Sequence, residues 1–380
     1  MSEKLVIGEK IVLKSEILGE DREILIRTPK GFENSTEKYP VLFLLDAEYF
    51  FQQTNSAIEF LSECGYINTQ IIPQMVVVGI VNVDRNRDYT PTYAPEQLET
   101  LKFPTSGKAE KFLKFMEKEL FPFVEENYRI QPFRILAGWS LGGLLAVHTY
   151  LEHPDLFSAY LAISPSLWWD GDLYVDKIKK FLTHRKLSNK PMVTTIGSLE
   201  GGDIGRSVRD GFIRLMVEEN DVELAFQFTE IPDENHSLVP YKAFFEGLKL
   251  LYSDWIPSDK VISSGINGIE GFYQKLSKKY QYQIRIPESV YIRYSNFISR
   301  QGKGDEALEI TKKYVQEYPQ SSFAHFYLGA RHERLGEFNL AIDNFKIAIE
   351  MEKKMLLPES EKLIAYRLNL QNVEEKRGQV

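Results

Sequence analysis

The sequence predicts an α/β protein with a mostly parallel central sheet, followed by an all-α helical-repeat region. Two observations lead to this prediction. In the first two thirds of the chain, short apolar runs alternate with segments of helical periodicity, as in a sheet whose parallel strands are joined by helices. After Trp255 the strand-like runs stop and the chain becomes helix-rich. We therefore expect an α/β domain over residues 1–255, a connecting segment over 256–284 and a helical domain over 285–380.

The N-terminal strands are expected to be antiparallel. The runs "KIVLKSEIL" and "REILIRTP" alternate apolar and polar residues, and Gly19 and Glu20 lie between them as a turn. The later runs "YPVLFLLD", "PQMVVVGIVNV" and "FRILAG" are continuously apolar, and "AYLAIS" and "MVTTIG" are weaker examples. Continuous apolar runs are typical of strands covered on both faces. Helices are predicted between them at 55–64, 108–127 and 141–152.

The C-terminal region contains two similar segments. Ala307 and Ala341 are 34 residues apart, as are Gly302 and Gly336, and this is the period of the tetratricopeptide repeat. The second segment resembles that family's pattern at Leu328, Gly329, Ala341, Phe345 and Ala348. Each helix pair needs a neighbour to cover its apolar face. We expect the pairs to pack on the α/β domain, on a closing helix at 359–375, or on a second subunit or protein partner.

Composition excludes several classes of partner. Lys and Arg number 46 and Asp and Glu 54, so the formal net charge is −8 at pH 7. This charge favours neither nucleic acid nor an anionic membrane as a partner. The first 32 residues carry charges every few positions and lack the apolar core of a secretory signal, so we expect a cytoplasmic protein. The single cysteine, Cys64, cannot form a disulfide within the chain and is interpreted as a small buried residue.

A candidate nucleophile lies in the stretch "RILAGWSLGGLLAVHTY". Ser140 sits between Gly138 and Gly142, after a buried strand and before a helix, which is the surround that a nucleophile elbow requires. Glycines suit a tight turn whose helix packs closely against the strand. The alternative is a structural serine in a glycine-rich turn. The order of candidate partners along the chain favours the nucleophile.

A serine hydroxyl needs an adjacent base, and in enzymes with such an elbow the order is serine, acid, histidine. Of the later histidines, His184 lies in a basic helix end, and His325 and His332 lie in the helical region. His236 follows a short strand, in a polar loop before a helix, and is the predicted base.

The acid is expected in the loop "SLEGGDIGRS", where Glu200 is favoured and Asp203 is the alternative. It would hold His236 in the correct tautomer and stabilise its imidazolium form. The oxyanion hole needs two backbone N–H donors. We assign Leu141, directly after the nucleophile, and Glu48, with Ala47 as second choice.

Four stretches together resemble the esterase family that includes enterochelin (siderophore) esterases, esterase D and the mycolyltransferase antigens. They are "VLFLLDAEYFF", "GIVNVDRNRDYTPTY", "AGWSLGGLLAVHTYLEHPDLFSAYLAISPSLWWD" and "DENHSLVPYKAFFEGL". The similarity covers roughly residues 8–255 and is strongest to the siderophore-esterase-like branch, through "DRNRDYTP" and "SPSLWWD". It implies an α/β-hydrolase fold and a Ser140–His236–Glu200 triad, and no cofactor or metal is expected. The family usually has Asp-Gly where this chain has Asp46-Ala47, so Ala47 would be strained if that position has positive φ.

Two further pairs are candidates for substrate binding. Arg85 and Arg87 follow a strand end and could hold a carboxylate or phosphate, or could pair with nearby aspartates. Trp168 and Trp169 follow another strand end and could line an aromatic pocket, or could pack a lid to which residues 86–107 contribute.

The sequence as a whole predicts a serine esterase that acts on a small-molecule ester through an acyl-enzyme. The alternatives are an acyltransferase with the same triad and a non-catalytic module that recruits partners through its helices.

Overall fold

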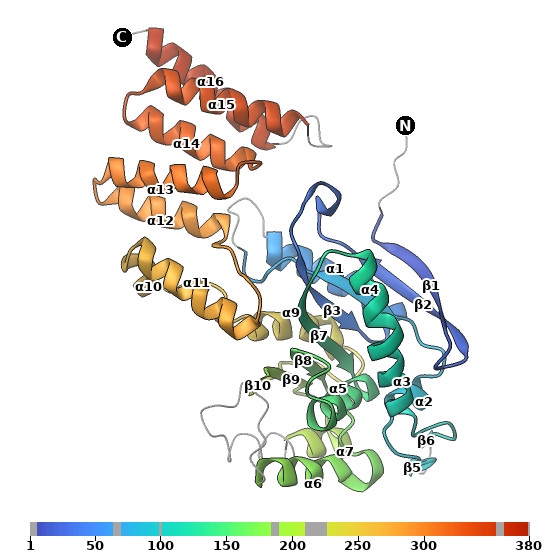
Figure 1. Ribbon diagram of the computed structural model, residues 1–380. Helices are drawn as coiled ribbons and strands as arrows, with labels where there is room; N and C mark the ends of the chain where they lie inside the picture. Colours follow the sequence, from blue (N-terminus) through green and yellow to red (C-terminus); the bar gives the residue numbers. More distant parts are fainter. Residues whose placement is uncertain are drawn as a thin grey trace. The chain divides into compact units, whose positions relative to one another are not determined.

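The computed structural model describes residues 6–63, 70–98, 101–183, 190–209, 226–354 and 361–378 (Figure 1). Cys64 and His184 lie outside these residues. The chain divides into two compact units. The first holds most of the chain up to Trp255 together with Tyr280–Tyr282, and the second holds Ile256–Lys279 and Gln283–Val380.

An eight-stranded sheet in the order β1-β2-β4-β3-β7-β8-β9-β10 forms the centre of the first unit. The strands are β1 (Glu9–Ser15), β2 (Glu20–Arg27), β3 (Tyr39–Leu44), β4 (Val76–Ile80), β7 (Ile130–Trp139), β8 (Ala159–Ile163), β9 (Met192–Gly197) and β10 (Phe226–Ile231). β1 pairs antiparallel with β2, and β2 with β4. All other neighbours in the sheet are parallel. The predicted α/β class with a mostly parallel sheet is confirmed.

Helices cover both faces of this sheet, which is why every residue of β3, β4, β8 and β9 is buried. On one face lie α1 (Ala47–Glu63) and α9 (Val239–Leu251). A Cβ at Gly79 of β4 would lie 2.7 Å from Ala47 Cβ, and one at Gly247 of α9 would clash with Leu161 of β8.

The other face carries a helical run after residue 108 and α5 (Leu141–Glu152). The Phe43 ring of β3 packs against Phe121 with centroids 4.8 Å apart, and the Tyr160 ring of β8 packs edge-on against Tyr150 of α5 at 5.3 Å. The helical run consists of α3 (Ala109–Phe115), a π-helical turn η3 (Met116–Leu120) and α4 (Phe121–Asn127).

The boundaries that differ from those predicted include the start of α1 and the end of β1. α1 begins at Ala47 rather than at residue 55, because its buried face already starts at Ala47 and continues through Phe51, Thr54, Ile58 and Leu61. The strand predicted to run through Leu18 ends at Ser15, whose hydroxyl accepts the Leu18 N–H at 2.9 Å and closes the turn before Gly19.

Short elements connect the strands at the edge that carries their carboxyl ends. They are α2 (Arg85–Tyr89), β5 (Glu96–Leu98), β6 (Leu101–Lys102), α6 (Trp169–Thr183) and α7 (Gly202–Arg206), whereas η1 (Phe32–Asn34) joins the end of β2 to the start of β3 at the opposite edge. The segment 86–107, expected to contribute to a lid, therefore contains most of the helical turn α2 and the two-stranded pair β5–β6. Asp170, Gly171 and Asp172 have left-handed backbone angles and kink the start of α6.

The second unit is all-helical in its described residues, as predicted for the C-terminal region. Its helices are α10 (Asp259–Ser263), α11 (Ile266–Tyr280), α12 (Glu288–Arg300), α13 (Gly304–Glu317), α14 (Ser322–Arg334), α15 (Phe338–Lys353) and α16 (Glu361–Gly378). α12 and α14 begin 34 residues apart, as do α13 and α15, and both pairs turn at a glycine with φ of 78°. The assignment of α12–α15 to the tetratricopeptide family stays a prediction. The segment predicted as a connection, 256–284, contains α10 and α11.

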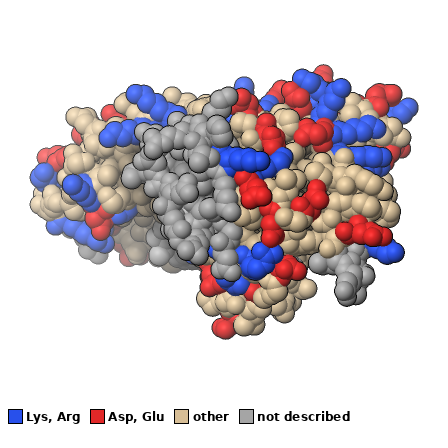
Figure 2. All heavy atoms as spheres, turned by 90° about the horizontal axis from the view of Figure 1, so that it is seen from below, with Lys and Arg blue, Asp and Glu red and all other residues tan. Residues whose placement is uncertain are grey.

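Charged side chains of both signs are interspersed over the face shown in Figure 2, with uncharged areas between them. Among the described residues, no helix combines the length and the apolar character needed to cross a membrane.

Candidate active site

Ser140 occupies a strained corner between β7 and α5. Its φ of 57° and ψ of −114° fall in a region of backbone conformation that residues other than glycine rarely adopt. The corner fits only because the surrounding positions are glycines. A Cβ at Gly138 would clash with the backbone of Gly142, and one at Gly143 would lie 2.9 Å from Pro165 Cα. This geometry projects the Ser140 hydroxyl from the end of the strand.

The structure brings the predicted base and acid to this serine. His236 Nε2 lies 3.0 Å from Ser140 Oγ, and His236 Nδ1 lies 2.7 Å from Glu200 Oε2. The Trp139 ring packs on the imidazole at 4.9 Å, and its Nε1–H donates to the His236 carbonyl at 3.0 Å. The imidazole is thus fixed between a carboxylate and a hydroxyl.

The alternative acid, Asp203, is placed elsewhere. It lies in the first turn of α7, where its exposed carboxylate is 3.4 Å from Arg206. Of the two candidate carboxylates in this loop, the structure brings Glu200 to His236.

The loops that carry Glu200 and His236 are bonded to each other through their backbones. Leu199 N–H donates to the Glu234 carbonyl at 3.0 Å, and Ser198 N–H donates to Ile231 at 2.9 Å. Gly197 is required at this crossing, because a Cβ there would clash with the Glu234 carbonyl. These contacts set the position of the carboxylate relative to the imidazole.

Glu200 is a buried carboxylate held in its ionised form. Burial would raise its pKa, but hydrogen bonds from His236, Ser164 and the Gly197 N–H outweigh burial and hold the pKa of Glu200 below its usual value. Ser164 Oγ donates to Glu200 Oε1 at 2.6 Å, and Gly197 N–H donates to the same oxygen at 2.8 Å. Because an ionised carboxylate only accepts, it holds the proton of His236 on Nδ1 and leaves Nε2 free to accept from Ser140.

Sequence reasoning missed two serines of this site, Ser164 and Ser166. Ser164 holds the Glu200 carboxylate, and the buried Ser166 has its Oγ 3.1 Å from Ser140 Oγ. The Ser166 N–H also donates to the Ser140 carbonyl at 3.1 Å. Their position directly after β8, beside the elbow strand in the sheet, was the available signal.

Arg85 lies beside the elbow and is engaged with the protein. Its Nε donates to Asp46 Oδ1 at 2.7 Å, and one terminal nitrogen donates both to Asp46 Oδ2 at 3.0 Å and to the Trp139 carbonyl at 2.9 Å. Burial would lower the pKa of Arg85, but the Asp46 charge outweighs it and raises the pKa. Arg85 therefore ties the loop after β3 to the end of β7.

The residue with positive φ in the loop after β3 is Asp46, at 55°, and Ala47 is the first residue of α1. The expected strain at Ala47 is therefore absent. A Cβ on Gly142 would lie 3.3 Å from Asp46 Oδ2, so this loop adjoins the elbow. The two assigned oxyanion donors, Leu141 and Glu48, stand in the first turns of α5 and α1, where backbone N–H groups lack intrahelical acceptors.

Arg87 is directed into a structural ion-pair network. Its guanidinium donates to Glu20 of β2 at 2.5 and 3.0 Å and to Asp88 at 2.7 Å. Asp88 is also paired with the buried Arg22. The structure thus shows Arg87 paired with Glu20 of β2 and with Asp88, and a role of Arg87 in substrate binding stays a prediction.

The two tryptophans pack the segment that the sequence predicted to be part of a lid. Trp169 is fully buried, donates from Nε1 to Thr92 Oγ1 at 2.9 Å and packs edge-on against Phe103 at 5.1 Å. Trp168 is half-buried, 6.4 Å from the same ring. Trp169 is therefore a packing residue, and only Trp168 of the pair keeps partial exposure.

Exposed apolar side chains neighbour the site residues along the chain. They are Tyr49, Val83, Tyr93, Leu199, Leu238 and Tyr241. Each lies in a loop or first helical turn that also carries a residue described above, or in the segment that Trp169 anchors. We refer to these six residues as the apolar rim.

Comparison with known proteins identifies the family. Residues 15–199 match the model of the family described as "Putative esterase". The ferri-bacillibactin esterase BesA of Bacillus subtilis is 32% identical over 219 residues, which cover 53% of this chain and 75% of that protein. The siderophore triacetylfusarinine C esterase of Aspergillus fumigatus is 27% identical over 174 residues, covering 39% of this chain and 60% of that protein.

A solved structure extends the similarity. The crystal structure of an IroE-like serine hydrolase from Shewanella oneidensis is 28% identical, with a TM-score of 0.70, and the match covers 82% of this chain and 99% of that one. The chain therefore belongs to the esterase family and is an esterase.

Proposed function

We propose that the protein is a serine carboxylic ester hydrolase in which Ser140, His236 and Glu200 act as nucleophile, base and acid. The observation that carries the proposal is the unbroken hydrogen-bond chain from Ser140 Oγ through both nitrogens of His236 to Glu200, at 3.0 and 2.7 Å. The strained backbone of Ser140 supports it, because such strain concentrates at sites of function.

The reaction proceeds in two halves. Ser140 Oγ attacks the ester carbonyl carbon while His236 Nε2 takes the hydroxyl proton. The tetrahedral intermediate then loses the alcohol, whose oxygen receives that proton from His236. Water then attacks the acyl-enzyme carbonyl while His236 takes one of its protons, the bond between that carbon and Ser140 Oγ breaks as Oγ receives the proton from His236, and the carboxylic acid leaves. Backbone N–H groups of Leu141 and Glu48 stabilise the oxyanion in both halves.

Turnover of p-nitrophenyl butyrate by wild type and Ser140→Ala tests the mechanism, with fluorophosphonate labelling as a second readout. We expect Ser140→Ala to lose turnover and labelling and the matched control Ser56→Ala, on the exposed face of α1, to keep both. Equal turnover by wild type and Ser140→Ala would remove the proposal.

The proposed substrate is a small-molecule siderophore ester that carries aromatic or apolar groups. Two relatives are named for siderophore esters, and the apolar rim supports a substrate with groups that extend beyond the ester itself. The test compares a catecholate triester siderophore and a hydroxamate siderophore ester, each iron-free and ferric, with p-nitrophenyl butyrate. We expect a higher kcat/KM for one siderophore class. Hydrolysis of p-nitrophenyl butyrate alone would refute this substrate class and leave the serine mechanism standing.

A further inference from the structure

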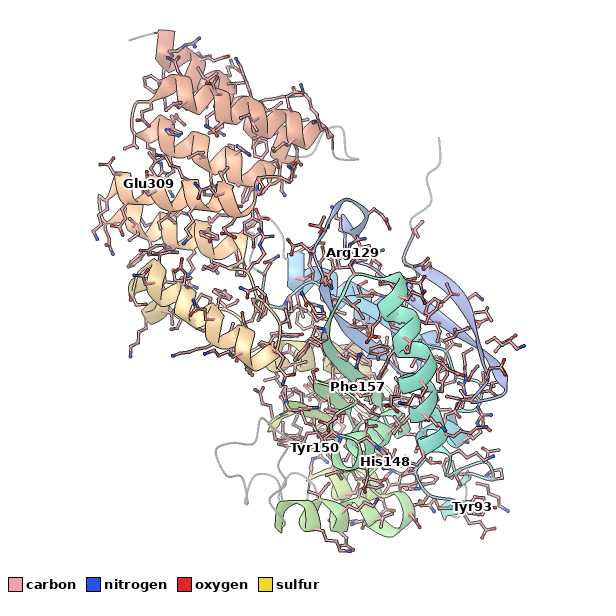
Figure 3. All side chains as sticks on the ribbon, in the orientation of Figure 1. Tyr93, Arg129, His148, Tyr150, Phe157 and Glu309 are labelled. Atoms are coloured by element: carbon pink, nitrogen blue, oxygen red, sulfur yellow. The ribbon has the colours of Figure 1, made fainter. Side chains whose placement is uncertain are left out.

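A second cluster of histidine and carboxylate side chains lies outside the esterase site. Glu110 is in the first turn of α3, His148 is on α5 (Figure 3), and His153 directly follows α5. Glu110 Oε1 lies 2.8 Å from His148 Nε2, and Glu110 Oε2 lies 2.8 Å from His153 Nε2. One ligand atom from each residue falls within 4.8 Å of the others. The three side chains thus converge on one point from two elements that are far apart in the sequence.

We propose that Glu110, His148 and His153 bind a divalent transition-metal ion of the Zn²⁺ type. Two imidazole nitrogens and one carboxylate are a common protein donor set for zinc sites that keep a fourth, open position. With metal–ligand bonds of 2.0–2.2 Å, tetrahedral donor atoms lie about 3.3 Å apart. The Glu110 oxygens lie 2.8 Å from the ring nitrogens, and the ligand atoms of the three residues lie within 4.8 Å of one another. To reach the tetrahedral spacing, the carboxylate would move slightly away from each ring and the two rings would move closer together.

The second ring nitrogen of His148 has a hydrogen-bond partner of the kind that metal-binding histidines have. His148 is buried, and its Nδ1 lies 2.8 Å from the hydroxyl of Tyr174 on α6. Metal-binding histidines typically use their second nitrogen in such a bond, which fixes the ring and directs the other nitrogen to the ion. The Tyr174 hydroxyl oxygen can accept from Nδ1–H, which leaves the Nε2 lone pair for a metal.

Glu110 and His153, the other two proposed ligands, leave the site open to solvent and can change their position when an ion binds. The side chains of Glu110 and His153 are 60% and 38% exposed, so an ion can enter from solvent and water can complete its coordination. His153 leaves the helix with φ of −132° and ψ of 53°, and its ring lies 5.9 Å from that of His148. The nearby charges of Glu152 and Lys177 are paired with each other at 2.6 Å, so the cluster keeps the negative charge of Glu110.

A bound ion would link the first turn of α3 to the C-terminal half of α5. α3 begins directly after the segment that Trp169 anchors, and its first N–H groups bond to the carbonyls of Arg87 and Thr90. We therefore expect the ion to stabilise the first unit without entering the esterase reaction.

The test is metal titration of the full chain after chelator treatment and dialysis. Zn²⁺ competition against a chromophoric chelator is expected to give one tight site per chain, and Co²⁺ is expected to give the visible absorption of a tetrahedral site. Glu110→Gln and His153→Gln should each weaken binding by more than about 10-fold and abolish the rise in melting temperature with Zn²⁺. Tyr174→Phe should weaken binding by about 10-fold.

Matched controls are Glu117→Gln, a neighbouring exposed carboxylate paired with Lys118, and His325→Gln in the helical unit. Both should bind as wild type does. Hydrolysis of p-nitrophenyl butyrate by metal-free Glu110→Gln should equal that of metal-free wild type, which shows that the variant is folded. The absence of stoichiometric binding by wild type, or equal binding by wild type and the Glu110→Gln/His153→Gln double variant, would overturn the proposal.

Discussion

Two clusters in the first unit use the same functional groups in different arrangements. At Ser140, an imidazole stands between a carboxylate and a hydroxyl. At Glu110, a carboxylate stands between two imidazoles. The carboxylate of the first cluster is buried and receives two further hydrogen bonds, whereas that of the second is exposed. The first arrangement directs one nitrogen lone pair at a proton to be removed, and the second directs several donor atoms at one point.

The largest effect should separate these two carboxylates by activity. Glu200→Gln keeps the shape of the side chain but loses the charge that holds the His236 tautomer, so kcat for p-nitrophenyl butyrate should fall by about 10³–10⁴-fold. Glu110→Gln should leave kcat unchanged. Asp203→Asn serves as a control in the same loop as Glu200 and should retain activity. A larger loss in Asp203→Asn than in Glu200→Gln would reverse the assignment of the acid.

A second comparison separates Arg85 from Arg87. Arg85→Met leaves the buried Asp46 without its cation and frees the loop after β3, so both stability and kcat should fall, stability by about 3 kcal/mol. Arg87→Met removes ion pairs with Glu20 and Asp88 on the side of β2 and should lower stability only. Urea unfolding and active-site-titrated kcat measure the two effects. An unchanged kcat in Arg85→Met would show that the Arg85–Asp46 pair does not position the site.

Ser166 should have a smaller effect on the same reaction. Its hydroxyl bonds the nucleophile oxygen, and loss of one such neutral bond is worth about 1 kcal/mol, or about 5-fold in rate. We expect Ser166→Ala to change kcat by this amount and to leave fluorophosphonate labelling complete. Complete loss of labelling in Ser166→Ala would mean that Ser166 does more than orient Ser140.

The sequence predicts those features of the site that depend on neighbouring residues, and it leaves open those that depend on contacts between residues far apart in the chain. The Ser140 elbow is encoded within a few residues, because the glycines that permit its backbone are its neighbours. His236 was identified from chain order and loop character. Glu200 and Asp203 lie in one loop three residues apart, and contacts with Glu234 and Ser164, distant in the sequence, decide which one reaches the imidazole.

The partners of Arg85 and Arg87 and the residues of the proposed metal site are also far apart in the sequence. Arg85 and Arg87 are two residues apart at a strand end, but their partners come from the loop after β3 and from β2, whose proximity depends on sheet order. Glu110 and His148 are separated by 38 positions, and no spacing motif links them. Such pairs become visible only when the strands and helices are assembled.

The smallest expected effect is the pH dependence that Glu200 adds to stability. Its folded-state pKa is lowered from 4.5, so the stability that its ionised form contributes is present above pH 4.5 and is lost as the pH falls through the lower, folded-state value. Glu200→Gln cannot titrate and should therefore lose less stability than wild type over this acidic range. Urea unfolding of both proteins at several pH values below 5 measures the difference, with Glu110→Gln as the matched exposed carboxylate. If the wild-type and Glu200→Gln curves stay parallel down to the acid limit, the bonds around Glu200 do not favour its ionised form, and the charge assigned to the triad acid is wrong.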